Sequence, residues 1–175
     1  MKKIRLTTPL DESDIRALRA GDQVQISGVI YSARDMAHKK LTALINESSP
    51  LPFELAGAAV YYLGPTPARE GEVIGAAGPT TSSRMDPFTP LLLSKGVKAT
   101  LGKGYRSPEV VRAFEDNTAV HLAVTGGAGA LLSRCIISSE VIAFADLGTE
   151  AVRRMEVENF PAIVAYDSIG GSVYR

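Results

Sequence analysis

Strand and helix signals alternate along this chain, and that order constrains the fold more than any other feature. Alternating or continuous apolar residues predict strands at 2–7, 24–31, 58–63, 72–76, 97–101, 120–124, 136–144 and 162–167. Helical spacing and end signals predict helices at 11–19, 36–45, 86–93 and 107–116, with a short one inside 126–133. Interleaved strands and helices indicate an α/β fold. No linker is visible, so we expect one domain over residues 1–175.

Polar residues mark where several of these helices begin. Residues 107–109 (Ser-Pro-Glu) provide an N-cap, a proline at the first helical position and an acid in the first turn. Asp86, followed by proline, is expected to open the preceding helix in the same way. Asp11 or Asp14 is expected to cap the first helix, which Gly21 ends.

The charge balance excludes a general attraction to polyanions. Lys and Arg number 19, as do Asp and Glu, so the net charge is zero and neither nucleic acid nor membrane is an expected partner. No apolar run approaches the roughly 18 residues of a membrane span, and no signal peptide is visible. The single cysteine, Cys135, forms no internal disulfide and is expected to be a buried, inert thiol. We therefore expect a cytoplasmic protein.

The first candidate site is residues 32–39 (Ser-Ala-Arg-Asp-Met-Ala-His-Lys), where a predicted strand passes into a helix. Helix starts favour anions, and Arg34 could hold a carboxylate with two parallel hydrogen bonds. The alternative is an ordinary helix start, in which Asp35 caps the helix and Arg34, His38 and Lys39 face water. His38 alone is typical of a structural histidine.

The second candidate is residues 78–86 (Gly-Pro-Thr-Thr-Ser-Ser-Arg-Met-Asp). Four hydroxyl residues in a row follow a Gly-Pro break, and Arg84 lies four residues beyond Thr80. Such a loop can bring hydroxyls, backbone N–H groups and a guanidinium to one small anion. The alternative is a surface loop rich in Ser and Thr that caps the next helix.

The third candidate is Gly102-Lys103-Gly104, which follows a predicted strand. The glycines permit close backbone approach, and Lys103 supplies a point charge. The spacing of a phosphate-binding P-loop is absent, and a plain turn is the alternative.

The fourth candidate is residues 125–130 (Thr-Gly-Gly-Ala-Gly-Ala), which superficially match a dinucleotide-binding loop. Leu132 stands where the third glycine of that motif belongs, although Asp146 could imitate the ribose-binding acid. The loop also lies late in the chain. Tight backbone packing is the other explanation for glycines at Gly126–Gly129.

Together these segments resemble the β subunit, or C-terminal domain, of class I iron–sulfur fumarases and the related L-tartrate dehydratases. The resemblance runs in order from about residue 20 to the end. It rests on residues 27–40, 78–86, 102–104 and 126–127, and on late matches at 147–152, 157–161, Asp167 and Gly170. The segments around Arg34 and from 78 to 86 are specific, whereas the short glycine pieces are not.

The resemblance implies a fold, an activity and a cofactor. The fold would be a swivelling β/β/α three-layer domain, and the reaction a reversible hydration of fumarate to L-malate. A [4Fe-4S] cluster with one open iron would act as a Lewis acid. In the family, three cysteines of an α subunit or N-terminal domain hold it. This chain, with one cysteine, would depend on such an α partner, with α2β2 as the implied assembly.

The resemblance also implies roles for four residues. Arg34 and Arg84 match the arginines that bind the substrate carboxylates, and Lys103 matches a lysine that contacts the substrate. Thr80 matches the threonine proposed to move the proton at carbon. A threonine hydroxyl is a poor base unless a nearby charge activates it, and the activating carboxylate is not identifiable in this sequence.

Two alternatives stay open at this stage. Within the same chemistry, tartrate could replace fumarate and malate as the small dicarboxylate substrate. In another functional class, the chain could be a non-catalytic module that binds an anion or a nucleotide through Gly126–Gly129.

Overall fold

Seven strands form one mixed sheet in the computed structural model, which describes residues 3–125 and 127–174. Four neighbouring pairs, β1–β2, β2–β3, β3–β4 and β4–β5, are parallel. The long last strand runs antiparallel to β5, β6 and β2. The strands are β1 (Ile4–Thr7), β2 (Gln23–Ser32), β3 (Ala59–Tyr61), β4 (Ala99–Gly102), β5 (Val120–Ala123), β6 (Ile136–Ala143) and β7 (Val152–Tyr166).

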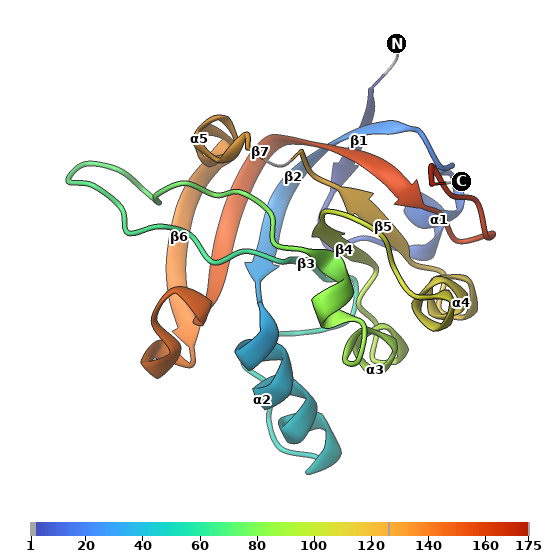
Figure 1. Cartoon of the computed structure of the whole chain (residues 1–175), viewed down its shortest axis with the longest axis horizontal. Helices are drawn as coiled ribbons and strands as arrows, with labels where there is room; N and C mark the ends of the chain where they lie inside the picture. The colour runs from blue at the N-terminus through green and yellow to red at the C-terminus, as the bar shows by residue number, and fades with distance from the viewer. Residues whose placement is uncertain (1–2, 126, 175) are drawn as a thin grey trace.

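The pairing of β2 with β7 closes part of this sheet upon itself. From β2 the ladder passes through β3, β4 and β5 to β7, and β7 then pairs back along β2 from Gln23 to Ser32. Figure 1 shows β7 crossing above β3 and β4 beside β2. The five strands therefore surround an interior.

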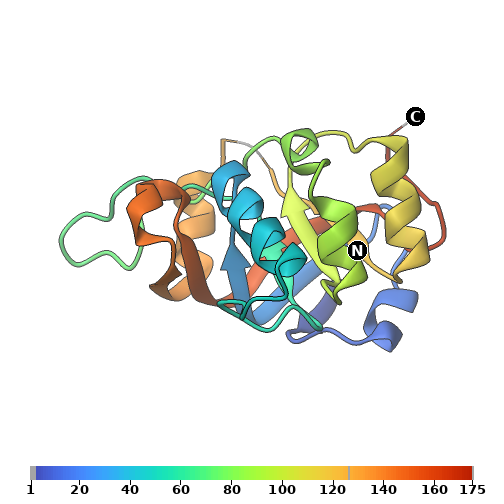
Figure 2. The same cartoon turned by 90° about the horizontal axis from the view of Figure 1, so that it is seen from below.

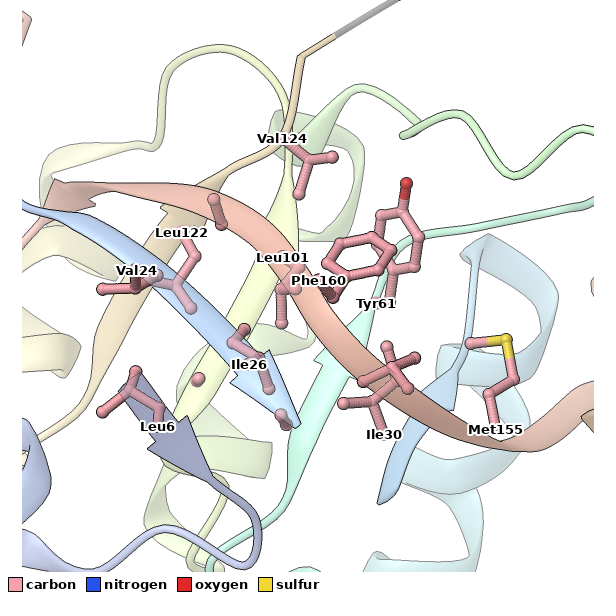
Figure 3. Close-up of a cluster of buried hydrophobic side chains, with 14 of the residues drawn as sticks. Leu6, Val24, Ile26, Ile30, Tyr61, Leu101, Leu122, Val124, Met155 and Phe160 are labelled. Atoms are coloured by element: carbon pink, nitrogen blue, oxygen red, sulfur yellow. The ribbon is translucent and has the colours of Figure 1, made fainter. Parts of the chain in front are cut away.

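Apolar side chains fill that interior because alternate residues of each strand point the same way. In β3, Ala59 and Tyr61 belong to the interior cluster, and Val60 belongs to the outer one. Figure 3 shows the interior side chains converging from β1, β2, β3, β4, β5 and β7. The labelled ones are Leu6, Val24, Ile26, Ile30, Tyr61, Leu101, Leu122, Val124, Met155 and Phe160, and all are buried.

Three helices form a layer on the outer face of β3 and β4: α2 (Asp35–Asn46), α3 (Thr89–Ser94) and α4 (Pro108–Asp116). They lie side by side in Figure 2. Leu41 of α2, Leu93 of α3 and Phe114 of α4 pack with the outward residues Val60 and Tyr62. The shorter helices are α1 (Glu12–Arg16), α5 (Gly129–Leu132), η1 (Ser82–Met85), η2 (Ser133–Cys135) and η3 (Ala145–Glu150).

Most predicted elements are confirmed, but one predicted strand, one predicted cap and the start of the last strand are wrong. Residues 72–76 form no strand, because the loop closes on itself: Ala76 N donates to Thr66 Oγ1 over 2.8 Å, and the segment pairs with no strand of the sheet. Asp86 does not cap α3, whose N-cap is Phe88. The strand predicted at 162–167 is the end of the 15-residue β7. Lys2 lies outside the described residues.

Capping predictions at two other helices are confirmed. Asp11 caps α1 by accepting from Asp14 N over 2.8 Å, and Ser107 Oγ accepts from Val110 N over 3.3 Å at the start of α4. Among residues 3–125 and 127–174, no helix is long and apolar enough to cross a bilayer.

Candidate active site

The four predicted site residues lie at one edge of the sheet. Arg34 follows β2 by two residues, and Lys103 follows β4 directly. Thr80 is held just past the end of β3, because its N–H donates to Tyr62 O over 2.7 Å. Since β2, β3 and β4 are parallel neighbours, their carboxyl ends share one edge. Open α/β sheets place ligands at this kind of edge.

Arg34 and Arg84 meet at one carboxylate. Arg84 donates from Nε to Asp35 Oδ1 over 3.0 Å and from Nη2 to Oδ2 over 2.8 Å. Arg34 Nη2 lies 3.7 Å from the same Oδ2. Asp35 occupies the first turn of α2, where its negative charge also interacts favourably with the helix dipole. The structure thus brings together two arginines that are 50 residues apart in the sequence.

Thr80 and Lys103 are joined through their backbones. Lys103 N donates to Thr80 O over 3.3 Å, and Ser82 N donates to Lys103 O over 2.8 Å. Gly102 makes this approach possible, because a Cβ there would lie 2.3 Å from Ser82 Oγ and 2.8 Å from Tyr62 Cδ2. The loop that carries Thr80 and Arg84 is therefore fastened to the end of β4.

A buried arginine secures the far end of this loop. The Arg106 side chain is fully buried and donates from Nε to Asp86 Oδ1 over 2.7 Å. Its terminal nitrogens donate to Thr89 Oγ1 over 2.6 Å and to the Tyr62 hydroxyl over 3.1 Å. Asp86 also accepts from Ser107 N over 2.8 Å. The carboxylate predicted to cap a helix instead neutralises this arginine.

His121, which lies in β5, contacts the middle of the 78–86 loop. Its Nε2 lies 3.2 Å from Ser82 Oγ, and its Nδ1 lies 2.8 Å from Thr100 Oγ1. Burial, reinforced by the charge of Arg106, lowers the pKa of His121 well below its ordinary value. The imidazole is therefore neutral at pH 7 and serves as a buried hydrogen-bonding link.

The whole chain matches one family model. The model is described as the fumarase C-terminus, and the match spans residues 1–175. The chain belongs to the fumarase C-terminus family.

Curated relatives agree with this family assignment. A fumarate hydratase 2 of Leishmania major is 36% identical over 98% of this chain and 31% of its own length. The anaerobic class I fumarate hydratase of Escherichia coli is 34% identical over 99% of this chain and 32% of its own length. A protein of Methanocaldococcus jannaschii, named a putative L(+)-tartrate dehydratase subunit beta, is 39% identical over 95% of this chain and 88% of its own length. The chain spans about a third of the two fumarate hydratases.

His38 contacts the backbone of Arg34 at this edge of the sheet, but its side chain does not face solvent. The side chain is buried, and its Nδ1 lies 2.8 Å from Arg34 O, so this nitrogen carries the proton and donates it. Burial lowers the pKa of His38 to about 4. The structural interpretation of His38 is confirmed, and the alternative in which it faces water is wrong, because its ring packs against Tyr62 and Phe88.

Cys135 lines a hollow of about 420 Å³ with Gln23 and Val24, which begin β2, and with Ala123, which ends β5. None of the four predicted site residues lines this hollow. The thiol is only half-buried, so the expectation of a fully buried cysteine was wrong, although burial still raises its pKa above the ordinary value. A larger hollow of about 530 Å³ lies between the 66–76 loop and α5–η2, and it includes none of the four site residues.

The glycine-rich loop shows close packing where it is described. Gly126 lies outside the described residues. At Gly129 an added Cβ would lie 3.0 Å from Gly78 N, and Ala77 N donates to Gly129 O over 3.1 Å. The backbone of Gly129 thus packs closely against the start of the 78–86 segment, as the packing interpretation predicted.

Sequence reasoning missed Arg106, His121 and the role of Asp86. Arg106 stands two residues past Gly104, so it could be taken for part of a surface turn. Its partner Asp86 is 20 residues away, and no spacing rule connects positions on two different loops. Only the ladder of β4 with β5 brings Thr100, His121 and Arg106 together.

Proposed function

We propose that this chain is the substrate-binding half of a class I hydro-lyase that reversibly hydrates fumarate to L-malate. The observation that carries the proposal is the convergence at Asp35 of the two arginines that match the family's carboxylate-binding positions. Thr80 and Lys103 lie on the same edge of the sheet, joined by a backbone hydrogen bond. We propose that one small dianion at this edge contacts all four side chains.

The cationic side chains suit the charge that develops in this reaction. Removing a proton from the carbon beside a carboxylate builds negative charge on that carboxylate. Arg34, Arg84 and Lys103 would stabilise that charge as it forms, and bidentate contacts would fix the orientation of the substrate. Loss of one well-placed donor costs on the order of 10²–10³ in rate.

Thr80 is proposed to transfer the proton at carbon. Its backbone is fixed on both sides, since its N–H donates to Tyr62 O and its carbonyl accepts from Lys103 N. The half-buried side chain thus has a defined position. A hydroxyl needs an activating carboxylate to act as a base, and we propose that the partner subunit supplies it.

The [4Fe-4S] cluster is proposed to be held by the partner and not by this chain. Clusters of this kind need several thiolates, and this sequence has one cysteine, which lines a hollow that includes none of the four site residues. Within residues 3–125 and 127–174, no three His, Cys, Asp or Glu side chains are grouped to hold a metal ion. When bound, the cluster would act as a Lewis acid toward the departing hydroxyl.

The partner and the domain type are part of the same proposal. The name of the Methanocaldococcus jannaschii relative, a subunit beta, supports a separate α subunit, and we propose an α2β2 assembly. We also propose that residues 1–175 form one domain of the swivelling β/β/α type. The ring of strands would supply two β layers, and α2, α3 and α4 the helical layer.

L-Tartrate dehydratase is the second candidate activity. The same relative favours it, because its name specifies tartrate and because it has the highest of the three quoted identities, at 39%. Tartrate is also a four-carbon dianion, so the two arginines and Lys103 would bind it by the same contacts.

Anaerobic co-production with the α partner tests the proposal. The purified pair is assayed with fumarate, malate and tartrate, and the chain alone serves as the control. We expect hydration by the pair and a colourless, inactive chain alone. Appreciable hydration by the chain alone would contradict the divided site, and no activity of the pair on any of the three acids would contradict the function.

A further inference from the structure

Asp35 is the point at which the two substrate-binding arginines are connected. It receives two hydrogen bonds from Arg84 and lies 3.7 Å from Arg34. The carboxylate is fixed to the first turn of α2, and its side chain is only 29% exposed. Asp35 therefore contacts both guanidinium groups from one fixed position.

Asp35 contacts only one edge of the Arg84 guanidinium. Nε and Nη2 form the side edge of the guanidinium, and both donate to Asp35. The end edge, formed by Nη1 and the second N–H of Nη2, can still take a carboxylate bidentately. Asp35 therefore orients Arg84 without occupying the edge that a substrate would need.

Arg34 is held between Asp35 and a glycine. A Cβ at Gly64 would lie 2.8 Å from Arg34 Nη1 and 3.0 Å from its Cδ, so the side chain runs close along that backbone. The Arg34 Nε atom is buried and makes no hydrogen bond within the described residues. Packing against Gly64 and the charge of Asp35 together set its direction.

We infer that Asp35 is a positioning residue that makes Arg34 and Arg84 a single clamp for a dicarboxylate. The inference rests on the proposed function. Asp35 also relieves the repulsion between two neighbouring cations.

Asp35→Asn tests the inference in the enzyme co-produced with its α partner. Asparagine keeps the size of the side chain but cannot pair with two guanidiniums. We expect kcat/KM for the dicarboxylate to fall about tenfold to a hundredfold, through a raised KM together with a lowered kcat, because the two arginines are proposed to bind the substrate carboxylates and to stabilise the charge that develops on them. Asp146→Asn is the matched control, since it also removes an aspartate that pairs with α2, but through Lys40 over 3.0 Å and not through an arginine.

The split between KM and kcat separates positioning from folding. A merely structural loss would lower the active fraction, and therefore the apparent kcat, while KM stayed normal. An Asp35→Asn enzyme with the KM of Asp146→Asn would overturn the inference while the wild-type activity still supported the proposed function. A wild-type pair inactive on all three acids would overturn both.

Discussion

Two arginines near the same loop make the same kind of ion pair in opposite surroundings. Arg106 binds Asp86 through Nε at 2.7 Å, and Arg84 binds Asp35 through Nε at 3.0 Å. The Arg106 side chain is 0% exposed, whereas that of Arg84 is 50% exposed. An ion pair alone therefore does not distinguish an arginine that holds the fold together from one that we propose to bind a ligand.

Arg106 and Arg84 differ in how many of their guanidinium N–H groups already donate to protein acceptors. Arg106 places at least four of its five N–H groups on protein acceptors: Asp86, Thr89, Tyr62 and Thr100. Within residues 3–125 and 127–174, Arg84 places two, both on Asp35. A guanidinium with an open edge can take a ligand, and one without an open edge holds the protein together.

The largest expected effect follows from removing Arg106. Arg106→Met keeps the length of the side chain but leaves Asp86 beside buried hydroxyls without a counter-charge. Breaking a buried pair from one side typically costs about 3–5 kcal/mol of unfolding free energy. Denaturant unfolding of Arg106→Met measures this loss, with Arg84→Met as the matched control. Equal stability of the two variants would remove the proposed contrast between the arginines.

The next largest effect is on turnover. Arg84→Ala removes an open guanidinium, so we expect kcat/KM of the enzyme with its α partner to fall by about 10²–10³. Unfolding free energy should change by less than about 1 kcal/mol, because the ion pair is half exposed. Steady-state assays and denaturant unfolding of one preparation measure both quantities. Near-normal kcat/KM would exclude Arg84 from the site.

A smaller effect concerns pH and His38. Its pKa is lowered to about 4 in the folded chain, from an ordinary value of 6.5, so the unfolded chain takes up a proton that the folded chain refuses. Stability is therefore full above pH 6.5 and falls as the pH drops toward 4. Between pH 7 and pH 5 the loss from this group is about 2 kcal/mol. His121 adds to the loss in the same direction.

His38→Asn isolates this contribution. Asparagine can keep a hydrogen bond to Arg34 O but does not titrate. Unfolding free energies at pH 7 and pH 5 should differ less in the variant than in the wild type. An unchanged difference would show that His38 is not the group responsible.

Apart from the strand wrongly expected at 72–76, the strand-and-helix order was predictable from the sequence, but the closure of the sheet was not. Alternation in residues 24–31 reflects one local property, the face that each side chain takes. The pairing of β2 with β7 joins residues more than 120 positions apart. The start of β7 was also missed, because Asn159, with φ of 51°, and Pro161 interrupt its apolar pattern.

The site shows the same division between local and distant information. Arg34, Thr80, Arg84 and Lys103 were selected by motif resemblance, and the structure places them at one edge. Their functional roles remain part of the proposal. The buried supports came only from the structure, because neighbouring strands and loops create them. A lone histidine such as His121 in an apolar strand gives no sign of which hydroxyls it will bind.

The smallest expected effect concerns the packing of the Arg34 side chain against Gly64. Gly64 does not have a positive φ, so alanine fits the backbone there, and the added methyl group collides chiefly with the Arg34 guanidinium. We expect Gly64→Ala to raise KM for the dicarboxylate about tenfold, through displacement of that arginine.

A double-mutant cycle with Arg34→Ala shows whether the methyl group acts through the arginine. In the Arg34→Ala enzyme the space is already vacant, so Gly64→Ala should cause no further loss of kcat/KM. An equal loss in both backgrounds would mean that Gly64 acts on the backbone near Thr149 O, which an added Cβ would approach to 3.4 Å, and not on Arg34. The contrast between an open arginine that must be aimed and a buried one that is already fixed would then lose its support at Arg34.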